Sequence, residues 1–156
     1  LVLALIALAV LIAAGLLAPF AGSVDRTGRV ALLDERHALD PDKSLGTALS
    51  FWAALDGPER FAQAVETAGL VPLLGLPVRD LSTGQKKRAA IARLLLGKAP
   101  IWLLDEPLNG LDSEWARRVE DLMRDHVAGG GIVLVASHQM LERLNPRALA
   151  IAGYAP

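Results

Sequence analysis

The sequence contains no cysteine, which excludes disulfides, thiolate catalysis and cysteine-based zinc sites. Aromatic residues make up only 4% of the 156 residues, whereas apolar residues make up 53%. This balance is typical of one α/β domain with a core of Leu, Ala and Val. The formal net charge is −1, so no strong field attracts nucleic acid or anionic lipid. The composition predicts one globular domain and no nucleic-acid partner.

The first part of the chain lacks charge altogether. Residues 1–24 contain no ionisable side chain, and residues 1–17 are almost entirely Leu, Ala, Ile and Val. A membrane-spanning helix needs about 20 apolar residues, so this stretch is a marginal candidate. It does not resemble a signal peptide, because no basic residue precedes it. The turn cluster at residues 18–23 ends any helix there.

Beyond this stretch, short apolar runs alternate with helical patterns. Such alternation is typical of a mostly parallel sheet covered by helices on both faces, so the predicted fold class is α/β. We expect Ser113 and Glu114 to cap the helix that they begin. The predicted strands cover residues 29–33, 101–104, 132–136 and 147–152, and the predicted helices cover residues 45–55, 59–68, 82–96, 113–127 and 139–144.

Two carboxylates follow directly after the apolar run at residues 101–104. Asp105 and Glu106 therefore lie at the carboxyl end of a predicted buried strand, where open α/β sheets bind ligands. One carboxylate there can hold Mg²⁺ on a nucleotide, usually through water. The other can orient an attacking water in phosphoryl transfer. An acidic turn after a strand is also common without function, so this motif alone leaves both interpretations open.

A second motif, Leu81-Ser82-Thr83-Gly84-Gln85, opens a basic helix. Ser82 is a favourable helix cap, and Gly84 lets a backbone or ligand approach closely. Free N–H groups at a helix start form an anion site together with the helix dipole. Taken alone, the motif fits better an ordinary capped helix whose Lys and Arg residues form a solvated face.

A third motif, Ser137-His138-Gln139, follows the apolar run at residues 132–136. A histidine at the end of a strand can contact a γ-phosphate or hold a water molecule. A single histidine is more often structural or simply exposed, so this motif also needs its neighbours for an assignment.

Together, in this order, the motifs resemble the nucleotide-binding domains of ABC-type ATPases. Thr83 stands where these ATPases more often have Gly. The resemblance covers residues 11–156, with a helical subdomain at about residues 40–97, and leaves residues 1–10 as an apolar segment of doubtful origin. Leu81 to Gln85 match the signature, Leu104 to Pro107 the end of Walker B, Leu108 to Asp112 the D-loop, and His138 the switch histidine.

The resemblance implies an α/β fold of the P-loop ATPase type, truncated in its amino-terminal part, with ATP and Mg²⁺ as ligands. In such a protein Asp105 would hold Mg²⁺, Glu106 would orient water and His138 would contact the γ-phosphate. Asp112 would connect the two sites of a head-to-tail dimer. The residues that would bind the ATP of the other subunit are Ser82, Thr83, Gly84 and Gln85.

Within this family the chain is similar to the ATP-binding subunits of the haem exporters of cytochrome c maturation, the CcmA type. The similar features are the sequence segment at residues 14–19, the helix at residues 89–94 and the short distance from His138 to the end of the chain. This similarity implies ATP hydrolysis coupled to haem export at the cytoplasmic face of a bacterial inner membrane. The implied partners are membrane-spanning transporter subunits and a second ATP-binding subunit.

Two features depart from the family pattern. A Gly-rich loop ending in Gly-Lys-Ser/Thr is expected before residue 11, but residues 1–10 contain no Gly, Lys, Ser or Thr. These residues could be a frame error, a membrane anchor on a degenerate ATPase, or a core helix of a chain that never hydrolyses ATP; the first is preferred. Arg36 and His37 stand where a Gln usually reaches towards Mg²⁺. The alternative function is a non-catalytic subunit that docks and dimerises without binding ATP itself.

Overall fold

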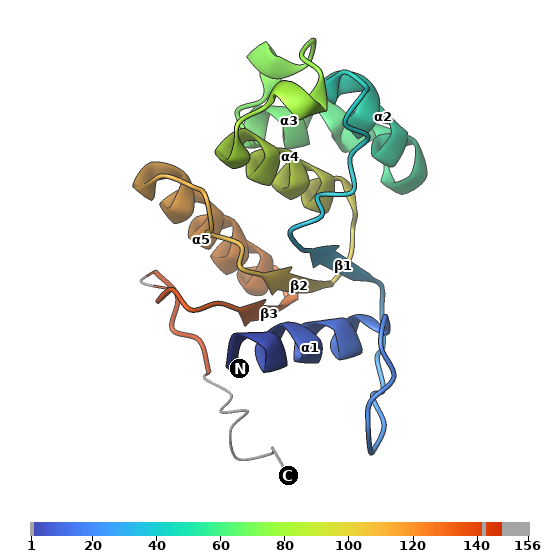
Figure 1. Cartoon of the computed structure of the whole chain (residues 1–156), viewed down its shortest axis with the longest axis vertical. Helices are drawn as coiled ribbons and strands as arrows, with labels where there is room; N and C mark the ends of the chain where they lie inside the picture. The colour runs from blue at the N-terminus through green and yellow to red at the C-terminus, as the bar shows by residue number, and fades with distance from the viewer. Residues whose placement is uncertain (1, 142, 148–156) are drawn as a thin grey trace.

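A single parallel sheet organises the computed structural model, which describes residues 2–141 and 143–147. Its strands lie in the order β1 (Val30–Leu33), β2 (Ile101–Asp105) and β3 (Ile132–Ala136). Leu33 is paired with Leu104 in β2, and Asp105 is paired with Ala136 in β3. Because the strands are parallel, their carboxyl ends meet at one edge (Figure 1). The predicted α/β class with a parallel sheet is confirmed.

Helices cover both faces of this sheet. On one face lie α4 (Thr83–Leu96) and α5 (Ser113–Ala128), and on the other lies α1 (Val2–Ala14), as Figure 1 shows. Successive side chains of a strand point to opposite faces. In β2, Trp102 and Leu104 accordingly pack towards α4 and α5, whereas Leu103 packs with Val10 of α1. The apolar run of β2 is thus explained by burial on both sides.

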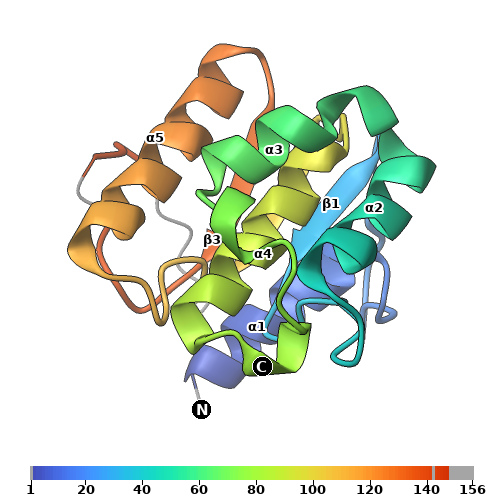
Figure 2. The same cartoon turned by 90° about the horizontal axis from the view of Figure 1, so that it is seen from above.

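A cluster of shorter helices packs on α4. It contains α2 (Leu45–Asp56) and α3 (Phe61–Thr67), with 3₁₀ turns at Pro58–Arg60, Val71–Leu73 and Val78–Asp80. Leu49, Leu70 and Ala89 are fully buried inside this cluster. Figure 2 shows α4 between α5 and α2. One helix therefore contacts both the sheet layer and the helical cluster, and a shift of α4 would be felt by both.

The apolar start of the chain forms α1, which is 13 residues long. Val10 is buried against β2 and β3, and Ala13 and Ala14 are partly buried beside it. Of the helices in the described residues, none is both long enough and apolar enough to cross a membrane. The origin of residues 1–10 stays a prediction.

The structure corrects two of the predicted element boundaries. Asp112, not Ser113, caps α5, because its Oδ1 accepts the N–H of Trp115 at 2.9 Å. The region 58–67 is divided into a 3₁₀ turn and α3 rather than forming one helix. The predicted strand at residues 147–152 lies outside the described residues except for Arg147, which is not in a strand.

The predicted helix at residues 139–144 is wrong for the residues described there. A side chain takes a backbone donor that such a helix would need. The N–H of Arg143 would bond to the carbonyl of Gln139 in that helix, but it donates to Glu120 Oε2 at 2.7 Å. This bond competes with helix formation.

Candidate functional site

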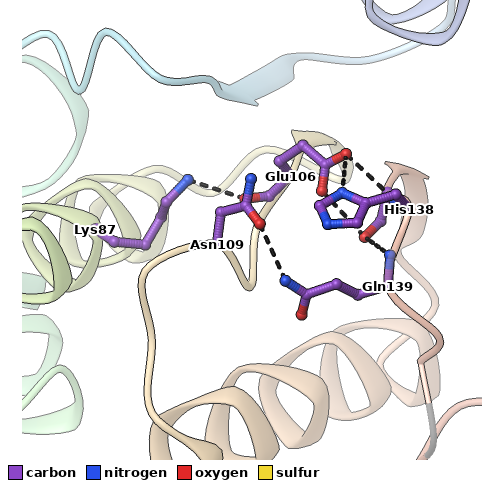
Figure 3. Close-up of polar contacts among 6 residues, drawn as sticks. Lys87, Glu106, Asn109, His138 and Gln139 are labelled. Carbon is purple, nitrogen blue, oxygen red and sulfur yellow. Dashed lines mark hydrogen bonds and ion pairs between the residues drawn. The ribbon is translucent and has the colours of Figure 1, made fainter. Parts of the chain in front are cut away.

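Glu106 lies at the carboxyl edge of the sheet with its main chain held from two sides. Its N–H donates to the carbonyl of Ala136, at the end of β3, at 2.8 Å. Its own carbonyl accepts a hydrogen bond from Lys87 Nζ, on α4, at 3.0 Å (Figure 3). Its φ is 46°, a left-handed conformation that non-glycine residues rarely adopt. Such a conformation costs about 1–3 kcal/mol and persists where neighbours fix it, often at functional sites.

The carboxylate of Glu106 meets the segment that follows β3. Its Oε1 lies 2.9 Å from His138 Nδ1 and accepts the main-chain N–H of His138 at 3.2 Å. Its Oε2 accepts the hydroxyl of Ser137 at 3.3 Å. The Glu106 side chain is 14% exposed and that of His138 is 52% exposed. Figure 3 shows the Glu106 carboxylate oriented by its donors beside the His138 ring, and the exposed fractions leave His138 more open to solvent than Glu106.

Asp105, the last residue of β2, is partly buried beside several other charged groups. Burial raises its pKa, and the carboxylates of Glu106 and Glu35 raise it further, whereas Lys87 opposes the shift. A cation would therefore relieve an excess of negative charge. Within the described ranges no three acidic or histidine side chains form a complete metal cage. Mg²⁺ typically takes only one or two carboxylates with waters and phosphate oxygens, so Asp105 fits that role.

The signature segment begins α4 with a complete capping box. Ser82 Oγ accepts the N–H of Gln85 at 3.2 Å, and Gln85 Oε1 accepts the N–H of Ser82 at 2.8 Å. A Cβ on Gly84 would lie 2.9 Å from the carbonyl oxygen of Gly110, so only glycine fits there. Thr83 and Ser82 remain exposed. The helix start thus packs on the 108–112 loop of its own chain and presents two hydroxyl side chains outward.

The predicted site residues fall into two groups. Asp105, Glu106 and His138 share one edge of the sheet, as expected. Among the described residues, no hydrogen bond joins residues 82–85 to Glu106 or His138. Asp112 is exposed and serves as the cap of α5. Among the described residues, Glu106 and His138 therefore form one hydrogen-bonded group that does not include residues 82–85.

Sequence reasoning missed Lys87, which it placed on a solvated basic face. Lys87 is only 3% exposed. Burial lowers the pKa of its ammonium group, while the nearby carboxylates of Glu35 and Asp105 raise it. The signal was its spacing: Lys87 is three, four and seven residues before Ala90, Ile91 and Leu94, which face the sheet. Because the other residues of this helix face are apolar, the spacing indicates that Lys87 is buried despite its charge.

Three further polar residues complete the edge. Gln139 Nε2 donates to Asn109 Oδ1 at 3.0 Å, which connects the segment after β3 to the loop after β2 (Figure 3). His37, in the loop after β1, is partly buried, and burial followed by the charge of Lys87 lowers its pKa. The loops after all three strands therefore approach the same few charged side chains.

Comparison with known sequences identifies relatives for most of the chain. The sequence profile of the ABC transporter family matches residues 12–109. The "cytochrome c biogenesis ATP-binding export protein CcmA" of Novosphingobium aromaticivorans is 52% identical over 145 residues, which are 93% of this chain and 74% of that protein. The protein of the same name from Zymomonas mobilis is 46% identical, over 90% of this chain and 64% of its own length. The chain therefore spans about two thirds to three quarters of these relatives.

Solved structures share the fold. An RNase-L inhibitor structure superposes with a TM-score of 0.67 at 28% identity, covering 82% of this chain and 25% of that one. The ATP-binding cassette MJ0796, described as a dimer in a post-hydrolysis state bound to ADP and Pi, gives a TM-score of 0.64 at 25% identity. That match covers 71% of this chain and 53% of the cassette.

Proposed function

This chain belongs to the ABC transporter ATPase family, and from that premise we propose that it is the ATP-hydrolysing part of an exporter subunit for cytochrome c maturation, with haem as the cargo. The observation that carries the proposal is the Glu106 carboxylate, fixed beside His138 at the carboxyl edge of a parallel sheet. The names of the relatives supply the export process.

In this proposal the residues at the sheet edge divide the work of phosphoryl transfer. Asp105 would hold Mg²⁺, and a bound Mg²⁺ would supply charge neutralisation at the phosphate oxygens. Glu106 takes a proton from the attacking water, for which its oriented, little-exposed carboxylate is suited. His138, half-exposed beside it, contacts the γ-phosphate.

The second surface of the chain acts on another ATP. The N–H groups at the start of α4, with the exposed Ser82 and Thr83, offer an anion site to a γ-phosphate held by a second subunit. Asp112, exposed at the start of α5, connects the two sites of such a dimer. The exposure of Ser82 and Thr83 at the helix start supports a head-to-tail arrangement, in which they would contact the other subunit.

The helical cluster then contacts the membrane-spanning subunits at the cytoplasmic face of the bacterial inner membrane. It passes on to them the conformational change that accompanies ATP hydrolysis. The outer face of α2 supports this role, because Phe51 and Leu55 are 60% and 64% exposed there. Exposed apolar side chains of this size favour contact with a partner when they occur together.

A complementation experiment tests the exported cargo. We define the chimera as residues 11–156 of this chain joined behind a Gly-rich phosphate-binding loop and the strands that precede it in ABC ATPases. In bacteria that lack their own ATP-binding subunit for cytochrome c maturation, the chimera should restore haem-stained c-type cytochromes. The chain as it stands should not, because residues 1–10 offer no such loop. A chimera that hydrolyses ATP at the membrane but restores no c-type cytochrome would assign it another cargo.

A further inference from the structure

We propose that Lys87 is a positioning residue, whose ammonium group holds the main chain of Glu106 and so links the signature helix α4 to the catalytic carboxylate of the same subunit. The proposal rests on the proposed role of Glu106 in ATP hydrolysis. It adds a function for a residue outside the signature, Walker B and histidine motifs.

The contact is made at the point where Glu106 needs support. Lys87 Nζ donates to the Glu106 carbonyl at 3.0 Å, and the Glu106 N–H is already engaged by Ala136 at 2.8 Å. Between these two bonds Glu106 has a φ of 46°. Removing either bond frees one side of a strained residue, which can then relax and move its carboxylate.

The cost of placing a charge there indicates a specific role. Lys87 is 3% exposed, and buried ammonium groups are rare unless they are paired. Its neighbours are carboxylates, with Glu35, Asp105, Glu106 and Asp34 all contributing favourably. The positive charge of Lys87 thus offsets the negative charge of these carboxylates. Its hydrogen bond fixes the main-chain carbonyl of Glu106.

The same helix then serves two ATP molecules. Ser82, at its start, would bind ATP of the partner, and Lys87 lies about one and a half turns further along on the face towards Glu106. A rigid helix moves as a unit, so engagement of its start by the partner's ATP also places Lys87. Engagement of the signature helix by the partner's ATP would therefore also stabilise the position of Glu106 in the same subunit.

The kinetic test uses the dimeric chimera with Lys87→Met, which keeps the length of the side chain but loses its donor. We expect kcat to fall by about 10- to 100-fold, since a displacement of about 1 Å in a reacting group can cost that much. KM for ATP should change less than threefold, because the nucleotide is bound by other residues. Lys87→Gln keeps an N–H donor and should recover part of the lost kcat.

The matched control is Lys86→Met. Lys86 lies on the same helix and also donates to a main-chain carbonyl, that of Arg79, at 3.0 Å. Its loss should leave kcat within twofold of the parent. Circular dichroism melting of both variants shows whether either has lost its fold, and Lys87→Leu, which also lacks a donor, replaces Lys87→Met in the comparison if the latter has.

A second measurement needs neither nucleotide nor hydrolysis. The chain has three histidines, so ring-labelled NMR spectra of the chain as it stands resolve His138. The His138 ring lies 2.9 Å from Glu106 Oε1, and its resonances should shift in Lys87→Met but not in Lys86→Met. His37 should shift as well, because its pKa is lowered in part by the charge of Lys87.

The outcomes separate this proposal from the proposed function. A normal kcat in Lys87→Met, an equal loss in Lys87→Met and Lys87→Gln, or a His138 signal that does not move would overturn the role of Lys87. A chimera that binds ATP without hydrolysing it would contradict the proposed function, while a shifted His138 signal in the chain itself would still support the link from Lys87 to Glu106.

Discussion

Replacing Glu106 with Gln in the chimera should reduce ATP turnover by about 10²–10⁴-fold, the usual effect of losing a positioned base. ATP should stay bound. A carboxamide can still accept the N–H of His138, which donates to Glu106 Oε1 at 3.2 Å, so the local structure should persist. It cannot take the proton of the attacking water, so the dimer should accumulate with ATP in place.

Single-turnover measurements with labelled ATP, followed by gel filtration, give both results at once. The control is Glu114→Gln, which removes an exposed carboxylate in the first turn of α5 and should leave turnover unchanged. Asp105→Asn should differ from both of these variants, because it should raise the Mg²⁺ concentration that ATP turnover requires. Turnover of Glu106→Gln within twofold of the parent would remove Glu106 from its role.

Ser82→Arg in the chain as it stands should silence a mixed dimer in which the partner's own nucleotide site is intact. The chain offers the start of α4 but no phosphate-binding loop, so it can complete a partner's site while its own stays empty. Losing an anion-stabilising donor at a reacting phosphate typically costs about 10²-fold or more. The bulky cation also blocks the exposed helix start.

The mixed-dimer experiment is most specific when the chimera partner itself carries Ser82→Arg. Both ATP sites of the chimera homodimer are then defective, because each contains Ser82→Arg. In the mixed dimer, the site built on this chain is defective because it lacks a phosphate-binding loop. The one working site combines the partner's loop with this chain's signature helix. ATPase activity of the doubly tagged, purified mixed dimer therefore reports on residues 82–85 of this chain alone.

Loss of a helix cap costs about 1 kcal/mol and must be separated from loss of the anion site. Ser44→Arg provides this comparison, because Ser44 caps α2 by accepting the N–H of Thr47, away from the sheet edge. Activity should survive Ser44→Arg and disappear with Ser82→Arg. Equal activity in both, or none in the parent mixed dimer, would mean that the signature helix here is not functional.

Much of this architecture is readable from local sequence. The apolar runs of β2 and β3 predict strands within one residue. In β2 the run reflects burial on both faces of the sheet, whereas Ile132 and Leu134 of β3 are exposed. Asp105, Glu106 and His138 could be brought together in advance, since parallel strands end at the same edge. Ser82 and Gln85 form the capping box that their spacing allows.

Tertiary contacts decide what the sequence alone could not. Its residue type predicts that Lys87 is solvated, but Lys87 lies on an apolar helix face and is buried. Its Nζ donates a hydrogen bond to the Glu106 carbonyl. The left-handed φ of Glu106 has no signature in residue type, because it is imposed by bonds from β3 and α4. The region after His138 has helical composition, but Glu120 takes the backbone N–H of Arg143, which such a helix would need.

The most direct test of the account is the ATPase rate of the purified chimera as a function of Mg²⁺ and of protein concentration. Residues 11–156 are expected to supply everything in the site except the phosphate-binding loop, so the chimera should hydrolyse ATP only with Mg²⁺. Its specific activity should rise with concentration as dimers form. A folded chimera that binds ATP but shows no Mg²⁺-dependent hydrolysis at any concentration would contradict the account.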